Sequence, residues 1–410
     1  MVKNKLSMKR ILVLFLLVCS FAAKAQIYSN APDIRAALLR NIQGRSAAKA
    51  FYQDSLYLLL NDITYQLGAP VGKTFYINQA SGVNYDSTAS NVGTNTTNIQ
   101  AFVNARTAGD VIVFSGKYQI NDEIVMKKGL TFVFYGGSLT LEGNTADGTK
   151  AAIKMDTSCS VIGVGLPLIR HAPSGANAYR GIRVVNTFDC KIEGVAITNF
   201  GNEGILVSGG GGGTNQMKAT RISNVYCYGM KNNGFGGTRG NGNGIALKSA
   251  GEYVKIENAY CIDNEGSGIL NDGSANCDII GGKFIRNDTA GVYVVGNVGN
   301  SDHFAIVGAQ FNHQDSSLAS FNVRIEDVDT GVNLTGCSIY GGAPLKVINS
   351  KGVSLNGCGM SGAGGGVYPH IQTSTVYING GHIIGVSQAT VLSNFTGGGT
   401  LQFNNVLDAL

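Results

Sequence analysis

A short alternating phrase recurs through the second half of the chain. It consists of an apolar residue, a variable one, an apolar one, another variable one, Asn or Gly, and then a small or apolar residue. Clear copies start at positions 254, 277, 304, 332, 353 and 376, and weaker ones at 159, 190, 220 and 401. Alternation of this kind predicts short strands with one buried face. The spacing of about 20 to 30 residues is too short for a propeller blade and suits one turn of a solenoid.

Further strands are expected between the copies of this phrase. Each begins with glycine and an aliphatic residue, namely Gly181-Ile182, Gly204-Ile205, Gly244-Ile245, Gly268-Ile269 and Gly291-Val292. Each repeat thus supplies two or three short strands, with Gly or Asn at the corners, where a positive φ costs least. The pattern predicts an all-β chain that is coiled as a parallel β-helix.

One column of the repeat is apolar in every copy, and this is a test of the coil. Three residues after the Asn or Gly corner stand Ile197, Cys227, Cys261, Phe284, Phe311, Ile339, Met360 and Ile383. The residue just before each of them is variable, and strand alternation explains the difference if the apolar column faces the interior. Cysteines within this column are then small buried apolar side chains, and disulfides between stacked neighbours are allowed but not required.

The first 94 residues do not follow the repeat. Residues 1–25 combine early cations, an apolar run and Ala23-Lys24-Ala25, which is typical of an export signal. Residues 26–70 have helix-like apolar spacing between 32 and 67, which indicates a helical cap or an oligomerisation segment. Residues 71–94 are rich in Gly, Ser, Thr and Asn and are expected to be a linker. No other stretch is apolar for long enough to span a bilayer.

Charge argues against one class of partner. The formal net charge is +5, and the first 25 residues carry five of the cations and no acid, so the exported chain would have no net charge. Nucleic-acid binding is therefore not expected. The export signal places the protein in the periplasm, at the cell surface or in the medium.

The start of the repeat region has a recognisable order of parts. A polar helix start at Asn95 leads to Ile99-Gln100-Ala101-Phe102, then come the strand Val111-Ile112-Val113-Phe114 and the turn Ser115-Gly116-Lys117-Tyr118. This segment resembles the entry module of the pectate-lyase-like superfamily, found in polysaccharide lyases and phage tail spikes, although that module usually has Pro where Ser115 stands. With the repeats, the resemblance covers roughly residues 80–410. It implies a right-handed β-helix domain over 95–410 that engages an extracellular polysaccharide.

The strands that open with glycine should expose a column of side chains on adjacent rungs, about 4.8 Å apart. In β-helix lyases and glycosidases the groove over such a face holds the sugar chain, so the resemblance makes this column the first site candidate. Its members, two and four residues after each glycine or its equivalent, are Arg183, Leu206, Ser208, Ala246, Lys248, Leu270, Asp272, Tyr293, Arg324, Glu326 and Lys346.

Lys248 is the candidate base within this column. The segment from Gly244 to Gly266 loosely resembles the part of family 9 pectate lyases in which a lysine removes the proton beside the uronate carboxylate. The resemblance implies that Lys248 is the base and that Arg324 or Arg239 neutralises the carboxylate. That family continues with an Asp pair for calcium, whereas this chain has Glu265-Gly266-Ser267. The alternative is that Lys248 forms an ordinary ion pair with Asp272 on the next rung.

Other chemistries have less support. Tyr226 and Tyr260 should stack on consecutive rungs of another face and could hold a sugar, or could only stabilise the sheet. The acidic residues do not form the motifs of polygalacturonases, so a glycosidase is the less expected enzyme. The histidines lack zinc spacing, and calcium near Asp272 and Asp278 is a weak expectation.

Two function hypotheses therefore remain. The first is a lyase that cleaves a uronic-acid polysaccharide by β-elimination. The second is a non-catalytic carbohydrate-binding, adhesive or tail-spike-like protein, with residues 32–67 holding a homotrimer together.

Overall fold

A computed structural model describes most of the chain from Gly72 onward. The described residues are 72–84, 92–143, 148–172, 178–209, 217–232, 241–248, 251–296, 303–312, 320–329, 331–361, 369–384, 387–393 and 395–409. The expected export signal (1–25) and helical segment (26–70) lie outside these ranges, as does Arg239.

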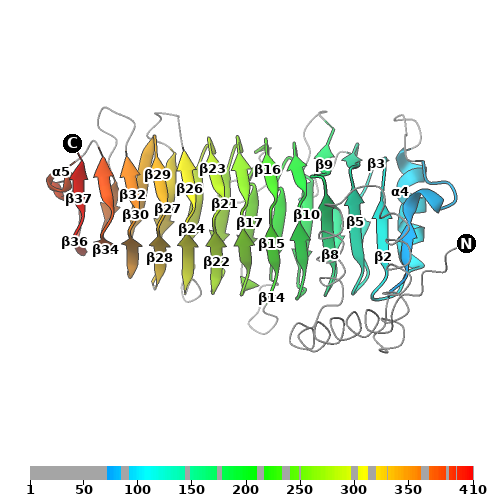
Figure 1. The fold of residues 1–410 in the computed structure, drawn as a ribbon, viewed down its shortest axis with the longest axis horizontal. Helices are drawn as coiled ribbons and strands as arrows, with labels where there is room; N and C mark the ends of the chain where they lie inside the picture. Colours follow the sequence, from blue (N-terminus) through cyan, green and yellow to red (C-terminus); the bar gives the residue numbers. More distant parts are fainter. Residues whose placement is uncertain are drawn as a thin grey trace, which may run out of the picture. The chain divides into compact units, whose positions relative to one another are not determined.

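Three long parallel sheets wind through the described part, with one strand from each in most rungs (Figure 1). Sheet A has 13 strands: β1 (Thr74–Tyr76), β2 (Val111–Phe114), β5 (Thr131–Tyr135), β8 (Ser160–Val164), β11 (Lys191–Glu193), β15 (Arg221–Ser223), β19 (Lys255–Glu257), β22 (Cys277–Ile280), β25 (Phe304–Val307), β28 (Val332–Thr335), β31 (Val353–Asn356), β34 (Thr375–Asn379) and β36 (Thr400–Asn404). Its strands contain the recurring phrase.

The next strand of each rung belongs to sheet B. Its 12 strands are β3 (Lys117–Ile120), β6 (Ser138–Leu141), β9 (Leu168–His171), β12 (Ala196–Thr198), β16 (Tyr226–Tyr228), β20 (Tyr260–Ile262), β23 (Lys283–Ile285), β26 (Gln310–Asn312), β29 (Ser338–Tyr340), β32 (Gly359–Ser361), β35 (His382–Ile384) and β37 (Leu407–Ala409).

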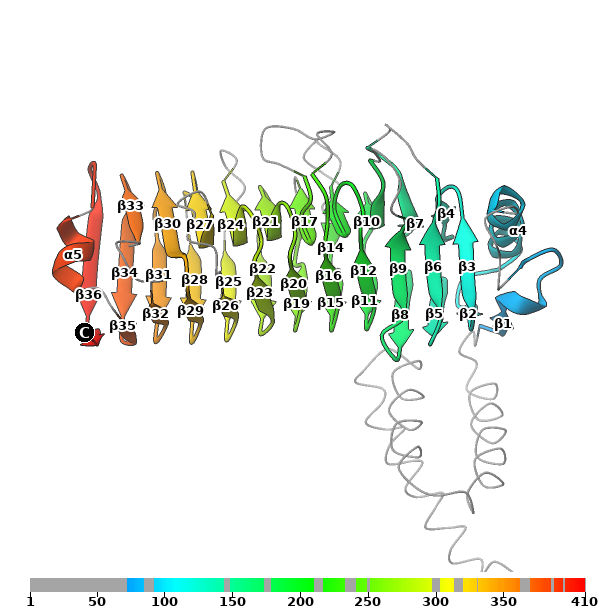
Figure 2. The same cartoon turned by 90° about the horizontal axis from the view of Figure 1, so that it is seen from above.

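Sheet C contains the strands that open with glycine, and they lie side by side along one edge of the view in Figure 2. Its ten strands are β4 (Ile124–Val125), β7 (Ala151–Met155), β10 (Arg180–Val185), β13 (Ile205–Ser208), β17 (Ile245–Lys248), β21 (Ser267–Asp272), β24 (Ala290–Val295), β27 (Phe321–Glu326), β30 (Ala343–Ile348) and β33 (His370–Gln372). A short pair, β14 (Met217–Lys218) and β18 (Gly251–Glu252), lies outside the three sheets. The chain is thus a right-handed parallel β-helix, and the predicted fold is confirmed.

The ends of the described coil are helical. Helix α4 (Val92–Asn104) lies at one end, and α5 (Gln388–Ser393) at the other (Figure 1). The expected linker, residues 71–94, includes a strand of the solenoid, because β1 pairs in parallel with β2 and is followed by the 3-10 turn η2 (Ile77–Gln79). Side-chain bonds fasten α4 to the coil, as where Asn95 donates to the carbonyl oxygen of Gln119 at 2.8 Å.

The corner between sheets A and B explains the Asn or Gly of the repeat. Asn258 has φ 51° and Gly281, one rung later, has φ 66°, so both adopt the left-handed conformation that these residue types tolerate. A corner of this kind lets the chain turn from one sheet to the next in two residues. The sequence therefore sets the rung length at these positions.

The interior column predicted from the repeat is confirmed. Its members pair rung to rung, as in Cys227 with Cys261 and Phe284 with Phe311, and all are at most 2% exposed. The seven cysteines of the described part are buried and carry no disulfide. They pack as apolar side chains, as the repeat indicated.

Candidate functional site

The candidate column of sheet C has the predicted register. Its middle members are nevertheless buried rather than exposed as expected, namely Leu206 (6%), Ala246 (0%), Leu270 (0%) and Tyr293 (5%). Leu206, Ala246, Leu270, Tyr293, Arg324 and Lys346 follow one another on successive strands, and Ser208, Lys248, Asp272, Val295, Glu326 and Ile348 form the row beside them. Charged side chains in these rows gather into two groups, one around Glu203 and one around Glu326.

The Glu203 cluster consists of Arg180, Asn202, Glu203 and Lys248. Glu203 lies two residues before the start of β13, and its side chain is completely buried. Arg180 Nε donates to Glu203 Oε2, and Lys248 Nζ lies 2.5 Å from Glu203 Oε1. With its amide nitrogen turned toward the carboxylate, Asn202 donates to both Glu203 oxygens at 2.9 and 2.7 Å, and its oxygen accepts from Arg180 Nη2 at 3.1 Å. One carboxylate is thus held between two cations.

Electrostatics explain why a carboxylate can be buried here. Burial acts to raise the pKa of Glu203, but the charges of Arg180 and Lys248 outweigh it, so the pKa lies below its ordinary value. Glu203 is therefore an anion, and both cations are committed to it. Removal of the Glu203 carboxylate would leave both cations without their counter-ion.

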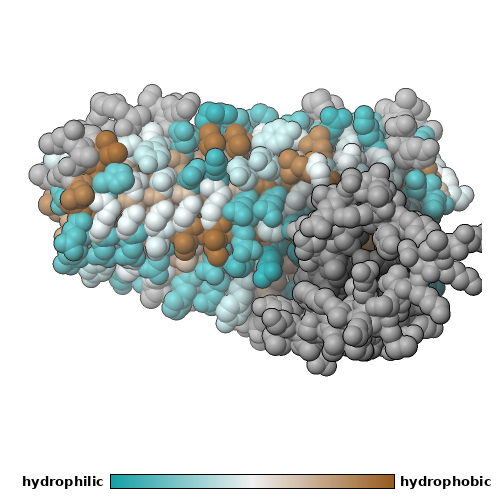
Figure 3. Space-filling model, viewed as in Figure 1, coloured by the Kyte–Doolittle hydropathy of each residue, from teal (hydrophilic) through white to brown (hydrophobic). Residues whose placement is uncertain are grey.

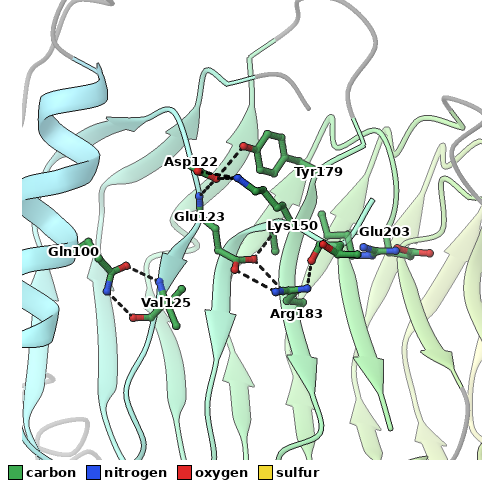
Figure 4. A network of polar contacts seen from close by, with 11 residues as sticks. Gln100, Asp122, Glu123, Val125, Lys150, Tyr179, Arg183 and Glu203 are labelled. Carbon is green, nitrogen blue, oxygen red and sulfur yellow. Dashed lines mark hydrogen bonds and ion pairs between the residues drawn. The ribbon is translucent and has the colours of Figure 1, made fainter. Parts of the chain in front are cut away.

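A third set of charges continues from the Glu203 cluster toward the N-terminal end of sheet C (Figure 4). Arg183 Nε lies 2.9 Å from Glu123 Oε2, and burial raises the pKa of Glu123 above its ordinary value. Asp122 accepts from Lys150 Nζ at 2.8 Å and from the Tyr179 hydroxyl at 3.1 Å. Burial acts to raise the pKa of Asp122, but the hydrogen bond from Lys150 helps to lower it below its ordinary value.

The Glu326 cluster consists of Tyr293, Arg324, Glu326 and Lys346. Arg324 grips the carboxylate with two bonds, Nε to Oε1 at 2.8 Å and Nη2 to Oε2 at 2.9 Å. The Tyr293 hydroxyl donates to Oε2 at 2.6 Å, and Lys346 Nζ lies 3.2 Å from Oε1. The Arg324 guanidinium also lies over the Tyr293 ring, 4.4 Å from its centroid.

The carboxylate of the Glu326 cluster is the more accessible of the two. Between a fifth and a quarter of the side chains of Arg324 and Lys346 is exposed, and 14% of Glu326. Burial acts to raise the pKa of Glu326, but the hydrogen bonds from Arg324 and Tyr293 outweigh it and lower the pKa to about 2. Two partly exposed cations therefore surround one anion at neutral pH.

Not all of the predicted site residues come together. The structure unites Tyr293, Arg324, Glu326 and Lys346. Lys248 stands beside Asp272 in register, but its 2.5 Å ion pair is with Glu203. Lys248 and Arg324 are three rungs apart, roughly 14 Å along the sheet.

The two predicted tyrosines form a stack elsewhere on the coil. The rings of Tyr226 and Tyr260 are parallel within 1°, with centroids 4.4 Å apart, on sheet B. They are thus on a different sheet from the charged clusters. A role for them in sugar binding stays a prediction.

Sequence reasoning missed the centre of the Glu203 cluster, although a signal was present. The residues before the strand-opening glycines of two successive repeats are Arg180 and Glu203, which have opposite charge. The strand register places these two positions on adjacent rungs. A search of that column for opposite charges would have found the pair.

Metal binding receives no geometric support among the described residues, since no three His, Cys, Asp or Glu side chains there gather as a metal-binding group. Calcium near Asp272 and Asp278 stays a prediction. In the same part of the chain, no helix is long and apolar enough to cross a bilayer.

Comparison with known proteins shows the fold. No protein-family model and no curated protein sequence matches this chain. Three solved structures resemble it, with matches to 82–84% of this chain. The first is the Dettilon tailspike protein, with a TM-score of 0.54, 16% identity and 68% of that chain covered. The second is a tailspike protein of the Acinetobacter baumannii bacteriophage Fri1, described as a capsular polysaccharide depolymerase, with a TM-score of 0.55, 12% identity and 63% of that chain covered. The third is the catalytic unit of a GH87 alpha-1,3-glucanase from Streptomyces thermodiastaticus, with a TM-score of 0.51, 13% identity and 68% of that chain covered.

This chain has the pectate-lyase-like β-helix fold. The identities are too low to transfer an activity, so the fold is what the three structures establish. The chemistry of this β-helix has to be argued from its own side chains.

Proposed function

We propose that this chain is an exported, polysaccharide-active β-helix protein and that a uronic-acid polymer binds along the outer face of sheet C. The observation that carries the proposal is the Glu326 cluster. There Arg324 and Lys346 exceed the charge of their single acidic partner, and both remain partly exposed. Among the solved structures that resemble this chain are two tailspikes, and one of them is described as a capsular polysaccharide depolymerase, which supports the same class of ligand.

Preorganisation of Arg324 supports a uronate ligand in particular. Its guanidinium is fixed by Glu326 on one side and by the Tyr293 ring on the other. Glu326 occupies the Nε and Nη2 edge, so a uronate carboxylate would bind through two parallel bonds to the Nη1 and Nη2 edge. A side chain that is already fixed loses less conformational entropy on binding. Lys346, one rung further, can meet the same carboxylate or the next one.

Cleavage by β-elimination is one use of this face. Lys248 would take the proton beside the uronate carboxylate, a carbon–carbon double bond would form, and the glycosidic oxygen on the neighbouring carbon would leave and take a proton from water. Lys248 is a quarter exposed, which supports this role. The uronate carboxylate would then be neutralised by cations near the Glu203 cluster, because Arg324 is three rungs away from Lys248.

Binding without cleavage is the use that the geometry favours. Lys248 is ion-paired with the buried Glu203, and an ammonium group cannot accept a proton. In this state Lys248 is a fixed positive charge that would attract a polyanion. We therefore place carbohydrate binding first and elimination second.

One experiment separates the two uses. The protein without residues 1–25 is incubated with pectic, alginate and glycosaminoglycan polymers, with and without calcium, while ultraviolet absorbance follows the unsaturated product and co-sedimentation follows binding. Binding without absorbance supports the first use. Absorbance that is lost in Lys248→Ala, but kept in the control Lys231→Ala, supports elimination.

The control has a clear basis, since Lys231 also forms an ion pair, with Glu265 at 3.0 Å, and is about half exposed. The proposal is contradicted if the protein binds none of these polymers and gives no absorbance with any of them. The proposed homotrimer is tested in the same preparation by light scattering, with and without residues 26–70.

A further inference from the structure

The middle one of three consecutive rungs of sheet A lacks an acid that both of its neighbours carry. Strand β11 reads Lys-Ile-Glu, β15 reads Arg-Ile-Ser and β19 reads Lys-Ile-Glu again. The strands pair in register, so the cations Lys191, Arg221 and Lys255 form one outward row. The row beside it contains Glu193, Ser223 and Glu257 in the same order, so the middle rung has a cation without the acid of its neighbours.

The outer two rungs neutralise themselves. Lys191 Nζ lies 2.9 Å from Glu193 Oε2, and Lys255 Nζ lies 2.7 Å from Glu257 Oε1. The middle arginine has only a loose contact among the described residues, 3.9 Å from Arg221 Nε to Glu257 Oε2. That distance is too long for a hydrogen bond.

The small side chain of the middle rung leaves a hollow. Ser223 is only 7% exposed because the longer side chains around it rise above it, whereas the Arg221 side chain is 58% exposed at the edge. Hydrophilic side chains cover this part of sheet A (Figure 3). The hollow has a volume of about 290 Å³ and is lined by Lys191, Glu193, Arg221, Ser223, Asn224, Glu257, Asn258 and Ile280.

We propose that this hollow binds an oxyanion carried by a polysaccharide, either a uronate carboxylate or a sulfate ester. Arg221 supplies the charge and a planar fork, and it gives up only a loose contact on binding. The Ser223 hydroxyl and the Asn258 amide add uncharged donors at the floor and the rim. Within these three rungs, Arg221 is the one cation whose own strand supplies no acid.

This site lies on sheet A and is independent of the site proposed on sheet C. The test therefore starts from Arg324→Ala/Lys346→Ala, in which the Glu326 cluster has lost its cations. Calorimetric titration of this protein uses three probes: a galacturonate hexamer, the same hexamer with its carboxyl groups reduced to alcohols, and a sulfated heparin-derived hexamer.

Two substitutions then address the hollow. Arg221→Ala removes the fork, and Ser223→Glu makes the strand Arg-Ile-Glu and so gives the arginine an acid on its own rung, as on the neighbouring rungs. Each is expected to weaken binding of the anionic probe at least about tenfold. Arg286→Ala is the matched control, because Arg286 is also exposed but is held by Asp263 at 2.6 and 2.7 Å, and it should change the affinity less than twofold.

The probes identify the anion. Binding of the galacturonate hexamer assigns the site to carboxylates, and binding of the sulfated hexamer alone assigns it to sulfate esters. The inference is overturned if neither anionic probe binds, if the reduced hexamer binds as well as the charged one, or if Arg221→Ala and Ser223→Glu bind like their parent. The sheet C proposal is tested separately. It fails if Arg324→Ala/Lys346→Ala binds the galacturonate hexamer with the same affinity as the unaltered protein.

Discussion

The two charged clusters of sheet C use the same parts in opposite ways. Each surrounds one glutamate with an arginine and a lysine, but Glu203 is fully buried and Glu326 is not. The cations of Glu203 come from two other rungs and serve to neutralise it. The cations of the two clusters are similarly exposed, 12 and 26% for Arg180 and Lys248 against 23 and 21% for Arg324 and Lys346. The clusters therefore differ in the carboxylate itself and in the aromatic ring that fixes Arg324. The comparison indicates that burial decides whether such a cluster stabilises the coil or remains available to a ligand.

The largest expected effect is on stability at the buried cluster. Glu203→Gln should lower the free energy of unfolding by about 3–5 kcal/mol, because Arg180 and Lys248 would lose their buried counter-ion. Glu326→Gln should cost only about 1.5 kcal/mol, since water can replace part of its partnership. Denaturant unfolding followed by circular dichroism measures both. Equal losses in the two variants would remove the distinction between the clusters.

Acid should affect the exposed cluster in a defined window. The pKa of Glu326 is lowered to about 2 from an ordinary value of 4.5. Because the folded pKa is depressed, its stabilising effect is present above the unfolded pKa and is lost as the pH falls through the folded pKa. The thermal midpoint should therefore fall between about pH 4.5 and 2, and Glu326→Gln should make this fall shallower. An unchanged acid profile in the variant would show that Glu326 is not held as described.

For ligand binding, unlike for stability, the Glu326 cluster should matter more than the Glu203 cluster. Arg324→Ala should weaken binding of a uronate oligosaccharide about tenfold while it lowers the free energy of unfolding by about 1.5 kcal/mol, as Glu326→Gln does. Arg286→Ala, an arginine in an exposed ion pair elsewhere, is the control. Titration calorimetry gives the affinities. Unchanged affinity in Arg324→Ala would assign the ligand to another face.

A smaller effect is expected when one hydrogen bond is removed and the ring is kept. Tyr293→Phe deletes the hydroxyl that donates to Glu326 at 2.6 Å but retains the surface beneath Arg324. We expect a loss of about 1 kcal/mol in stability and less than about threefold in affinity. The same unfolding and titration experiments measure it. A loss as large as that of Arg324→Ala would mean that the hydroxyl itself contacts the ligand.

The sequence predicted the coil because its signals are local. The apolar column through Cys227 and Cys261 and the corner at Asn258 recur every rung, so their spacing defines the register. The same register brought Tyr293, Arg324 and Lys346 together, since their strands follow one another without long insertions. The repeat therefore allowed the Glu326 cluster to be predicted from the sequence.

The Glu203 cluster was harder to predict for a physical reason. Lys248 and Glu203 are 45 residues apart, and long insertions separate their strands. The sequence does not show which side chains approach the buried carboxylate. Asp272, which is adjacent to Lys248 in register, was therefore the simpler partner to expect for Lys248. The first β-strand was missed too, because its Gly- and Asn-rich surroundings are typical of a linker.

The central claim is that a uronate polymer lies on the outer face of sheet C. Carbodiimide coupling tests it directly, because it joins uronate carboxyl groups to lysine amines that lie beside them. Peptide mass spectrometry of the protein coupled to a galacturonate hexamer should find the sugar on Lys346 and Lys248. Sugar found only on lysines of sheet B, such as Lys283, with Lys346 and Lys248 unmodified, would contradict the account.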